Sequence, residues 1–165
     1  MPEYTNILFC TDFSEDANIA FLHALNLAAK FGAKLHILHV PHSPFVYAKH
    51  IVDEHTSKNE AGGDHAFFDQ GIVDEAQIKL RKEYEGRMGD FKSYTFVVAC
   101  GSPDIEIVRY ARTNNVDLIV MGALGRADVD KLDHGSTVSS VSKFAHCHVM
   151  AIRNPLKQFT LPIKG

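Results

Sequence analysis

The chain has 165 residues, of which 45% are hydrophobic and 22% are charged, a balance that excludes disordered and fibrous classes of protein. The 17 Lys and Arg residues are outnumbered by 20 Asp and Glu residues, giving a formal net charge of −3. This charge argues against a surface that binds nucleic acid or an anionic membrane. No apolar run is long enough to span a membrane. We therefore expect one domain over residues 1–165.

Three cysteines, Cys10, Cys100 and Cys147, are widely separated and show no CxxC spacing. An odd number of dispersed cysteines is typical of reduced thiols that serve as small core residues. The first residues of the chain also lack the positive charges of a signal peptide. Both observations predict a cytoplasmic protein.

The first predicted elements are a strand and a helix. Residues 6–10 form an apolar run that predicts a β-strand. Ser14 can then cap a helix in which alanines and phenylalanines recur at helical spacing. Gly32 can end that helix in the left-handed conformation.

A second strand is predicted at residues 34–40, and a long variable loop is predicted at 41–70. Prolines, glycines and polar residues interrupt the apolar pattern throughout this loop. A connection of this length in a compact domain is typically mobile or functional. The helical pattern resumes at about residues 72–88.

The rest of the chain continues the alternation of strands and helices. One helix begins with Ser102 as its N-cap and Pro103 in its first turn, and another begins after Gly135. Three further apolar runs predict strands at residues 94–100, 117–122 and 147–152. This alternation predicts an α/β fold with a parallel sheet and right-handed crossovers.

The segment after the fourth predicted strand carries a glycine pattern that favours phosphate binding. Gly122 and Gly125 are followed, after nine residues, by Gly135 and Ser136. Glycines let backbone amides approach an anion, and the start of a helix favours phosphate. The hydroxyls of Ser136 and Thr137 can donate to phosphate oxygens or cap that helix. The pattern is neither a Walker motif nor G-x-G-x-x-G, so a surface loop with a serine N-cap is the alternative interpretation.

Three blocks of the sequence resemble the nucleotide-binding type of the universal stress protein family. They are Thr11-Asp12-Phe13-Ser14 after the first strand, Leu38-His39-Val40 at the end of the second, and G-x-x-G-x9-G-[ST] at Gly122, Gly125, Gly135 and Ser136. The resemblance covers the chain outside the 41–70 loop. It implies an adenine-nucleotide alpha-hydrolase-like fold, an open five-stranded parallel sheet of order 3-2-1-4-5 with helices on both faces. It also implies a homodimer joined through the last strand, residues 147–153.

The same resemblance implies a nucleotide site. Four residues would lie against the adenine: Cys10, Thr11, Asp12 and Val40. Six residues would hold the ribose and phosphates: Gly122, Gly125, Arg126, Gly135, Ser136 and Thr137. The implied ligand is ATP, with ADP or AMP as alternatives and Mg²⁺ or Mn²⁺ as an accompanying cation. Cys10 stands where many nucleotide-binding members of the family have proline.

The spacer between Gly125 and Gly135 is more acidic than is usual in the family. It carries three aspartates: Asp128, Asp130 and Asp133. Carboxylates beside a triphosphate would repel it, so we expect them to face solvent. Holding a cation is the alternative role.

Asp12 is expected to serve the ligand, because Ser14 is already available to cap the following helix. His36 and His39 are three residues apart in a predicted strand. Side chains at that spacing point to opposite faces, so these two histidines cannot chelate one metal ion.

The sequence therefore predicts a cytoplasmic, dimeric protein that binds ATP or another adenine nucleotide and acts in the stress response through an unknown protein partner. The stress role comes from the resemblance alone. No residue spacing predicts a general base opposite a phosphate, so we expect weak ATPase activity at most. Two alternatives stay open: a dimeric interaction module without nucleotide, and a weak ATP hydrolase or phosphotransferase.

Overall fold

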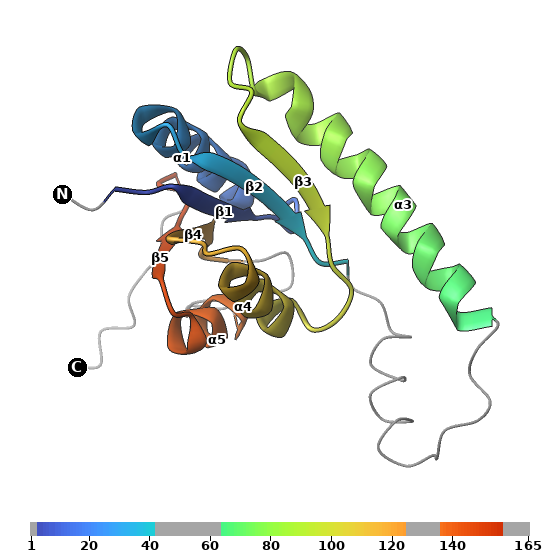
Figure 1. Cartoon of the computed structure of the whole chain (residues 1–165). Coiled ribbons are helices and arrows are strands. Elements are labelled where there is room, and N and C mark those ends of the chain that lie inside the picture. The colour runs from blue at the N-terminus through green and yellow to red at the C-terminus, as the bar shows by residue number, and fades with distance from the viewer. Residues whose placement is uncertain (1–2, 42–63, 125–135, 157–165) are drawn as a thin grey trace.

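The structure is a computed structural model, and it describes residues 3–41, 64–124 and 136–156 (Figure 1). Its five strands form one parallel sheet in the order β3-β2-β1-β4-β5. The strands are β1 (Asn6–Cys10), β2 (Lys34–His39), β3 (Tyr94–Val98), β4 (Leu118–Gly122) and β5 (His148–Ile152). The predicted fold class and strand order are confirmed.

Helices cover both faces of the sheet (Figure 1). They are α1 (Glu15–Phe31), α3 (Asp64–Tyr84) with the short η1 (Glu85–Arg87), α4 (Pro103–Thr113) and α5 (Ser136–Phe144). The α1 and α3 helices pack on one face, and α4 and α5 pack on the other. No helix in the described part of the chain is long and apolar enough to cross a membrane.

Successive residues of β1 feed two separate cores. Phe9 points toward α1 and α3, whereas Leu8 and Cys10 point toward α4 and α5. This division follows from the alternation of side chains along a strand. Phe9 and Leu8 are both fully buried, and burying a side chain of this size stabilises the fold by about 1.5–3 kcal/mol.

The α1 helix has the ends that the sequence predicts. The Ser14 hydroxyl accepts a hydrogen bond from the Ala17 amide at its start. At its end, Gly32 adopts φ 65°, and its N–H bonds to the Ala28 carbonyl. Both caps satisfy backbone groups that a helix leaves without partners at its termini.

Local predictions differ from the structure at one strand end, one helix start and one helix cap. The strand predicted at 94–100 ends at Val98. The helix predicted at 72–88 begins at Asp64, so residues 64–70 of the predicted loop are helical. The rest of that loop, apart from Pro41, lies outside the described residues. Ser102 occupies the N-cap position of α4, but its hydroxyl makes no capping bond. It donates to Asp104 Oδ1 at 2.6 Å, and the same carboxylate oxygen accepts the Ile105 amide at 2.9 Å in place of the serine hydroxyl.

Candidate functional site

The ends of β1 and β4 lie side by side at the carboxyl edge of the sheet. Cys10 pairs with Met121 in register. The segments that follow the two strands therefore begin next to each other at this edge. The first turn of α1 lies there as well (Figure 1). This is the edge at which open parallel sheets bind ligands.

Gly122 ends β4 in close contact with α1. A Cβ at this position would lie 2.7 Å from the Ala17 nitrogen and 2.9 Å from the Asp16 carbonyl carbon. Such distances are too short for any side chain. The sequence predicts that Gly122 lets backbone amides approach an anion. The structure shows another requirement for glycine here, because the backbone of α1 leaves no room for a Cβ.

The two residues after Gly122 are held by hydrogen bonds on several sides. Ala123 N donates to Ile152 O at 2.7 Å, and Leu124 N donates to Asp16 Oδ2 at 3.2 Å. The Ser14 hydroxyl donates to Leu124 O at 3.4 Å. The start of the predicted phosphate loop is therefore fixed to α1 and to β5.

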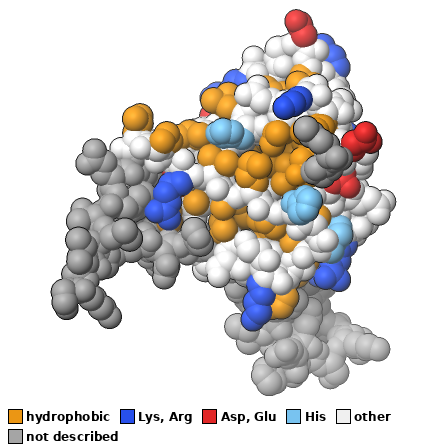
Figure 2. Space-filling model, turned by 90° about the vertical axis from the view of Figure 1, so that its left-hand side faces the viewer, with side chains coloured by type: hydrophobic (Ala, Val, Ile, Leu, Met, Phe, Trp, Pro, Cys, Tyr) orange, Lys and Arg blue, Asp and Glu red, His pale blue; other side chains and the backbone are white. Residues whose placement is uncertain are grey.

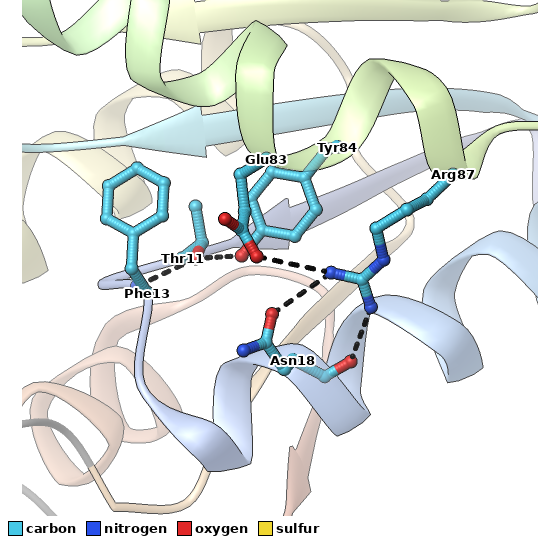
Figure 3. Close-up of polar contacts among 6 residues, drawn as sticks. All are labelled: Thr11, Phe13, Asn18, Glu83, Tyr84 and Arg87. Carbon is cyan, nitrogen blue, oxygen red and sulfur yellow. Dashed lines mark hydrogen bonds and ion pairs between the residues drawn. The ribbon is translucent and has the colours of Figure 1, made fainter.

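The turn after β1 is held from the side of α3 (Figure 3). Thr11 Oγ1 lies 2.6 Å from the Tyr84 phenol and accepts a hydrogen bond from Phe13 N at 3.0 Å. His39 Nδ1 donates to the Thr11 carbonyl at 2.7 Å, and Asp12 Oδ1 accepts from Ser14 N at 3.0 Å. Burial is the main cause that raises the pKa of Tyr84 to about 12, so its phenol is neutral.

Phe13 adopts a backbone conformation that is rare for a large side chain, with φ 62°. Such a conformation costs about 1–3 kcal/mol and is kept only where the surroundings impose it. The Phe13 ring lies 4.6 Å from the His39 ring and 6.1 Å from the Tyr84 ring. Lys79 Nζ lies 4.2 Å from the Phe13 ring centroid. These contacts fix the direction in which the chain leaves Asp12.

The short η1 helix, which directly follows α3, is tied to α1 close to this turn (Figure 3). Arg87 donates to the side-chain oxygen of Asn18 at 3.1 Å and to its carbonyl at 3.5 Å. Its guanidinium also lies 3.6 Å from Glu83 and stacks 4.6 Å from the Phe21 ring centroid. The turn after β1 is therefore held between two helices that are themselves joined.

Cys10 and Val40 lie on the opposite face from Thr11. Both contribute to the core that also contains Val138 of α5. Burial, and to a lesser extent Cys147, raises the pKa of the Cys10 thiol well above its usual range. The thiol therefore behaves as a small neutral group. Ser136, at the start of α5, is exposed.

Asp104 joins the start of α4 to α5. It accepts the Ser140 hydroxyl at 2.6 Å on one oxygen and the Ser102 hydroxyl at 2.6 Å on the other. These two bonds lower the pKa of the Asp104 carboxyl, so it is ionised at neutral pH. Sequence analysis missed this contact. The Ser-Pro-Asp start of α4 gives a local signal, but nothing in the sequence identifies Ser140 as its partner.

The universal stress protein family model matches residues 3–153. The chain belongs to the universal stress protein family. It is 31% identical over 157 residues to universal stress protein MJ0531 of Methanocaldococcus jannaschii, covering 94% of this chain and 85% of that protein. The structure of UspA from Lactobacillus plantarum is 28% identical, with TM-score 0.69, over 93% of this chain and 100% of that one. The structure of MJ0577 from Methanocaldococcus jannaschii is 25% identical, with TM-score 0.71, and the match covers 96% of this chain and 100% of that one.

Two more distant structures share the fold and were solved with nucleotides. One is a universal stress protein in complex with cAMP, 20% identical with TM-score 0.58, over 92% of this chain and 98% of that one. The other is the Archaeoglobus fulgidus universal stress protein in complex with dAMP. It is 19% identical with TM-score 0.50, and the match covers 92% of this chain and 99% of that one. At these identities the likeness is one of fold.

In this universal stress protein, the described site residues fall into two groups. Cys10, Val40 and the start of α5 share the face covered by α4 and α5, whereas the Thr11 side chain is turned toward α3. Asp12 is half-buried at the edge between them. The other predicted site residues and the three spacer aspartates lie outside the described residues: Gly125, Arg126, Gly135, Asp128, Asp130 and Asp133.

The histidines of β2 point to opposite faces of the sheet, as predicted. His36 contacts the Tyr110 hydroxyl at 2.8 Å and Asn6 Oδ1 at 3.3 Å, whereas His39 bonds to Thr11. Burial, with a smaller effect of Lys34, lowers the pKa of His36 to about 4. Within the described residues, no three His, Cys, Asp or Glu side chains are placed to hold a metal ion.

Proposed function

We propose that this universal stress protein binds an adenine nucleotide, with ATP as the ligand, at the edge where β1 and β4 end. The observation that carries the proposal is the convergence of three segments: the turn after β1, the Gly122 exit from β4, and the start of α5. The cAMP and dAMP complexes of family members with the same fold also support it.

The chemistry of the described residues suits such a ligand. Val40 is half-buried and offers an apolar surface of the kind that an adenine ring packs against, whereas Cys10 is buried in the same core. The start of α5 offers backbone N–H groups, the positive end of the helix dipole, and the hydroxyls of Ser136 and Thr137. These are groups that hold phosphate without a charged side chain.

A divalent cation is part of the proposal for ATP. Mg²⁺ or Mn²⁺ would take most of its ligands from phosphate oxygens and water, and one or two from carboxylates. Asp12 has the right donor chemistry and lies at this edge, half-buried. One of its oxygens already accepts the Ser14 amide, which orients the carboxylate.

The function we propose is binding. Family membership supports a role in stress physiology, and we place that role in the cytoplasm, where nucleotide occupancy would be sensed by a protein partner. The whole chain, residues 1–165, would act as one domain. A weak ATP hydrolase in the same site is the competing function, and release of phosphate from ATP with Mg²⁺ would distinguish it from a binder.

The proposal includes a homodimer through β5, an edge strand of the sheet. His148 N donates to Asp117 O, and Ile152 O accepts from Ala123 N. Backbone groups alternate in direction along a strand of a parallel ladder. The alternate residues, Val149 and Ala151, therefore direct their N–H and C=O groups away from β4. Figure 2, viewed from the side on which β5 lies in Figure 1, shows hydrophobic side chains gathered across the middle of this face. An edge of this kind favours antiparallel pairing with a second copy.

Mass spectrometry of the small molecules released from the denatured, purified protein tests the nucleotide proposal. We expect an adenine nucleotide from the wild type and a large loss of it from Gly125→Asp, which adds bulk and negative charge to the glycine pattern. Gly71→Ala, at an exposed position of α3 with open space around it, is the control and should keep its nucleotide. Release of a ligand that is not a nucleotide would overturn the proposal.

A further inference from the structure

Asp16 is a fully buried carboxylate in the first turn of α1. Its two oxygens accept hydrogen bonds from two backbone amides that are distant in the sequence. Oδ2 accepts from Leu124 N at 3.2 Å, and Oδ1 accepts from Asn154 N at 3.2 Å. One side chain therefore joins the segment after β4 to the segment after β5.

A buried carboxylate is costly unless its charge is compensated. Two backbone amides and the positive end of the α1 dipole contribute to this compensation here. Hydrogen bonds to an ionised acceptor are about twice as strong as neutral ones. The buried charge and the two segments therefore depend on each other, since moving either segment would leave a carboxylate oxygen without its amide.

Both segments matter for the function proposed above. Leu124 immediately precedes Gly125, and its carbonyl accepts the Ser14 hydroxyl. Asn154 follows the end of β5, and Ile152 O accepts from Ala123 N. The start of the glycine-rich segment and the end of the edge strand are thus bonded to each other and to Asp16.

We propose that Asp16 is a positioning residue that sets the start of the phosphate loop and couples nucleotide binding to the segment after β5. This inference rests on the proposed nucleotide function. A ligand that binds where the segment after β4 begins strengthens the Leu124–Asp16 contact, and the same carboxylate then holds the Asn154 amide more firmly. Coupling of this kind is reciprocal, so loosening the Asn154 segment weakens the binding of nucleotide.

The test combines ATP titration with hydrogen exchange at the Leu124 and Asn154 amides. In the wild type, ATP should slow exchange at both amides. Asp16→Asn keeps the side-chain size but turns an NH₂ group toward one of the two amides. We expect it to weaken ATP binding at least about tenfold and to abolish the effect of ATP on Asn154. Glu15→Gln, which makes the same charge change at an exposed position of the same turn, should bind ATP as the wild type does.

Three outcomes decide the matter. Failure of the wild type to bind ATP overturns the proposed function, and this inference with it. Wild-type binding without any change at Asn154 overturns the inference alone, and this arm requires no variant to fold. Equal ATP affinity of the wild type and a folded Asp16→Asn protein, checked by circular dichroism, also overturns it.

Discussion

Thr11 Oγ1 lies 2.6 Å from the phenolic oxygen of Tyr84, although 73 residues separate the two in the chain. The same threonine oxygen accepts the Phe13 amide. The Thr11 side chain therefore anchors the turn after β1 to α3. What the turn presents at the edge of the sheet is Asp12, together with the backbone around it.

Tyr84→Phe should lower the free energy of unfolding by about 1 kcal/mol, because it removes one buried hydrogen bond and keeps the aromatic ring. The ring contacts with Phe9 and Phe21 stay in place. Urea denaturation measures the change. Tyr94→Phe, at a half-buried position on β3, makes the same chemical change as a control and should be near neutral. Equal stability of the two variants would show that the Thr11–Tyr84 bond contributes nothing.

Gly122→Ala should destabilise the fold by about 1–3 kcal/mol, since the new methyl group would overlap the backbone of α1. Gly71→Ala provides the matched control. Nothing lies within 4 Å of a Cβ at Gly71, and alanine within a helix is favoured over glycine by about 0.5–1 kcal/mol. Thermal denaturation should therefore move the two variants in opposite directions. A Gly122→Ala protein as stable as the wild type would disprove the close approach of β4 to α1.

The free energy of unfolding should fall in mild acid, because His36 is protonated more readily in the unfolded chain than in the fold. Its pKa is near 6.5 in the unfolded chain and is lowered to about 4 in the fold, mainly by burial. The unfolded state therefore takes up the proton first. The stability linked to His36 is complete above pH 6.5 and is lost as the pH falls toward 4, by up to about 1.4 kcal/mol per pH unit.

His36→Gln should flatten this pH dependence, because glutamine stays neutral and can still contact Tyr110 and Asn6. Urea denaturation at a series of pH values compares the two proteins. NMR titration of the His36 ring gives the same information directly, and a ring that titrates near 6.5 would contradict the prediction.

Ala151→Pro should convert the proposed homodimer into a monomer. The Ala151 N–H is directed away from β4, so proline removes a donor from the outer edge and leaves the β4–β5 ladder intact. Sedimentation at micromolar concentration measures the mass. Ala151→Ser keeps the N–H and should stay dimeric with the wild type. A wild type that sediments as a monomer, or a dimeric Ala151→Pro protein, would exclude pairing through β5.

The features that local sequence determines could be predicted. The bounds of β1, the Ser14 cap and the Gly32 end of α1 each depend on a few neighbouring residues. The start of α3 at Asp64 could not be predicted, because residues 62–71 contain three glycines and a single apolar run at 66–68, which does not repeat at helical spacing.

The contacts that shape the candidate site join residues that are far apart in the sequence. Asp16 and Leu124 are 108 residues apart, and no pattern along the chain indicates that they meet. Gly122 illustrates the same limit, since its motif was predicted from the sequence while its contact with α1 requires the folded structure.

Isothermal titration calorimetry of the 165-residue chain with ATP, in the presence of Mg²⁺, measures most directly whether the edge formed by β1 and β4 holds a nucleotide. Saturable binding of one ATP per chain is expected for the wild type, with no measurable heat of binding for Gly125→Asp. A wild-type protein that gives no binding, or a Gly125→Asp protein that binds equally well, would contradict the assignment.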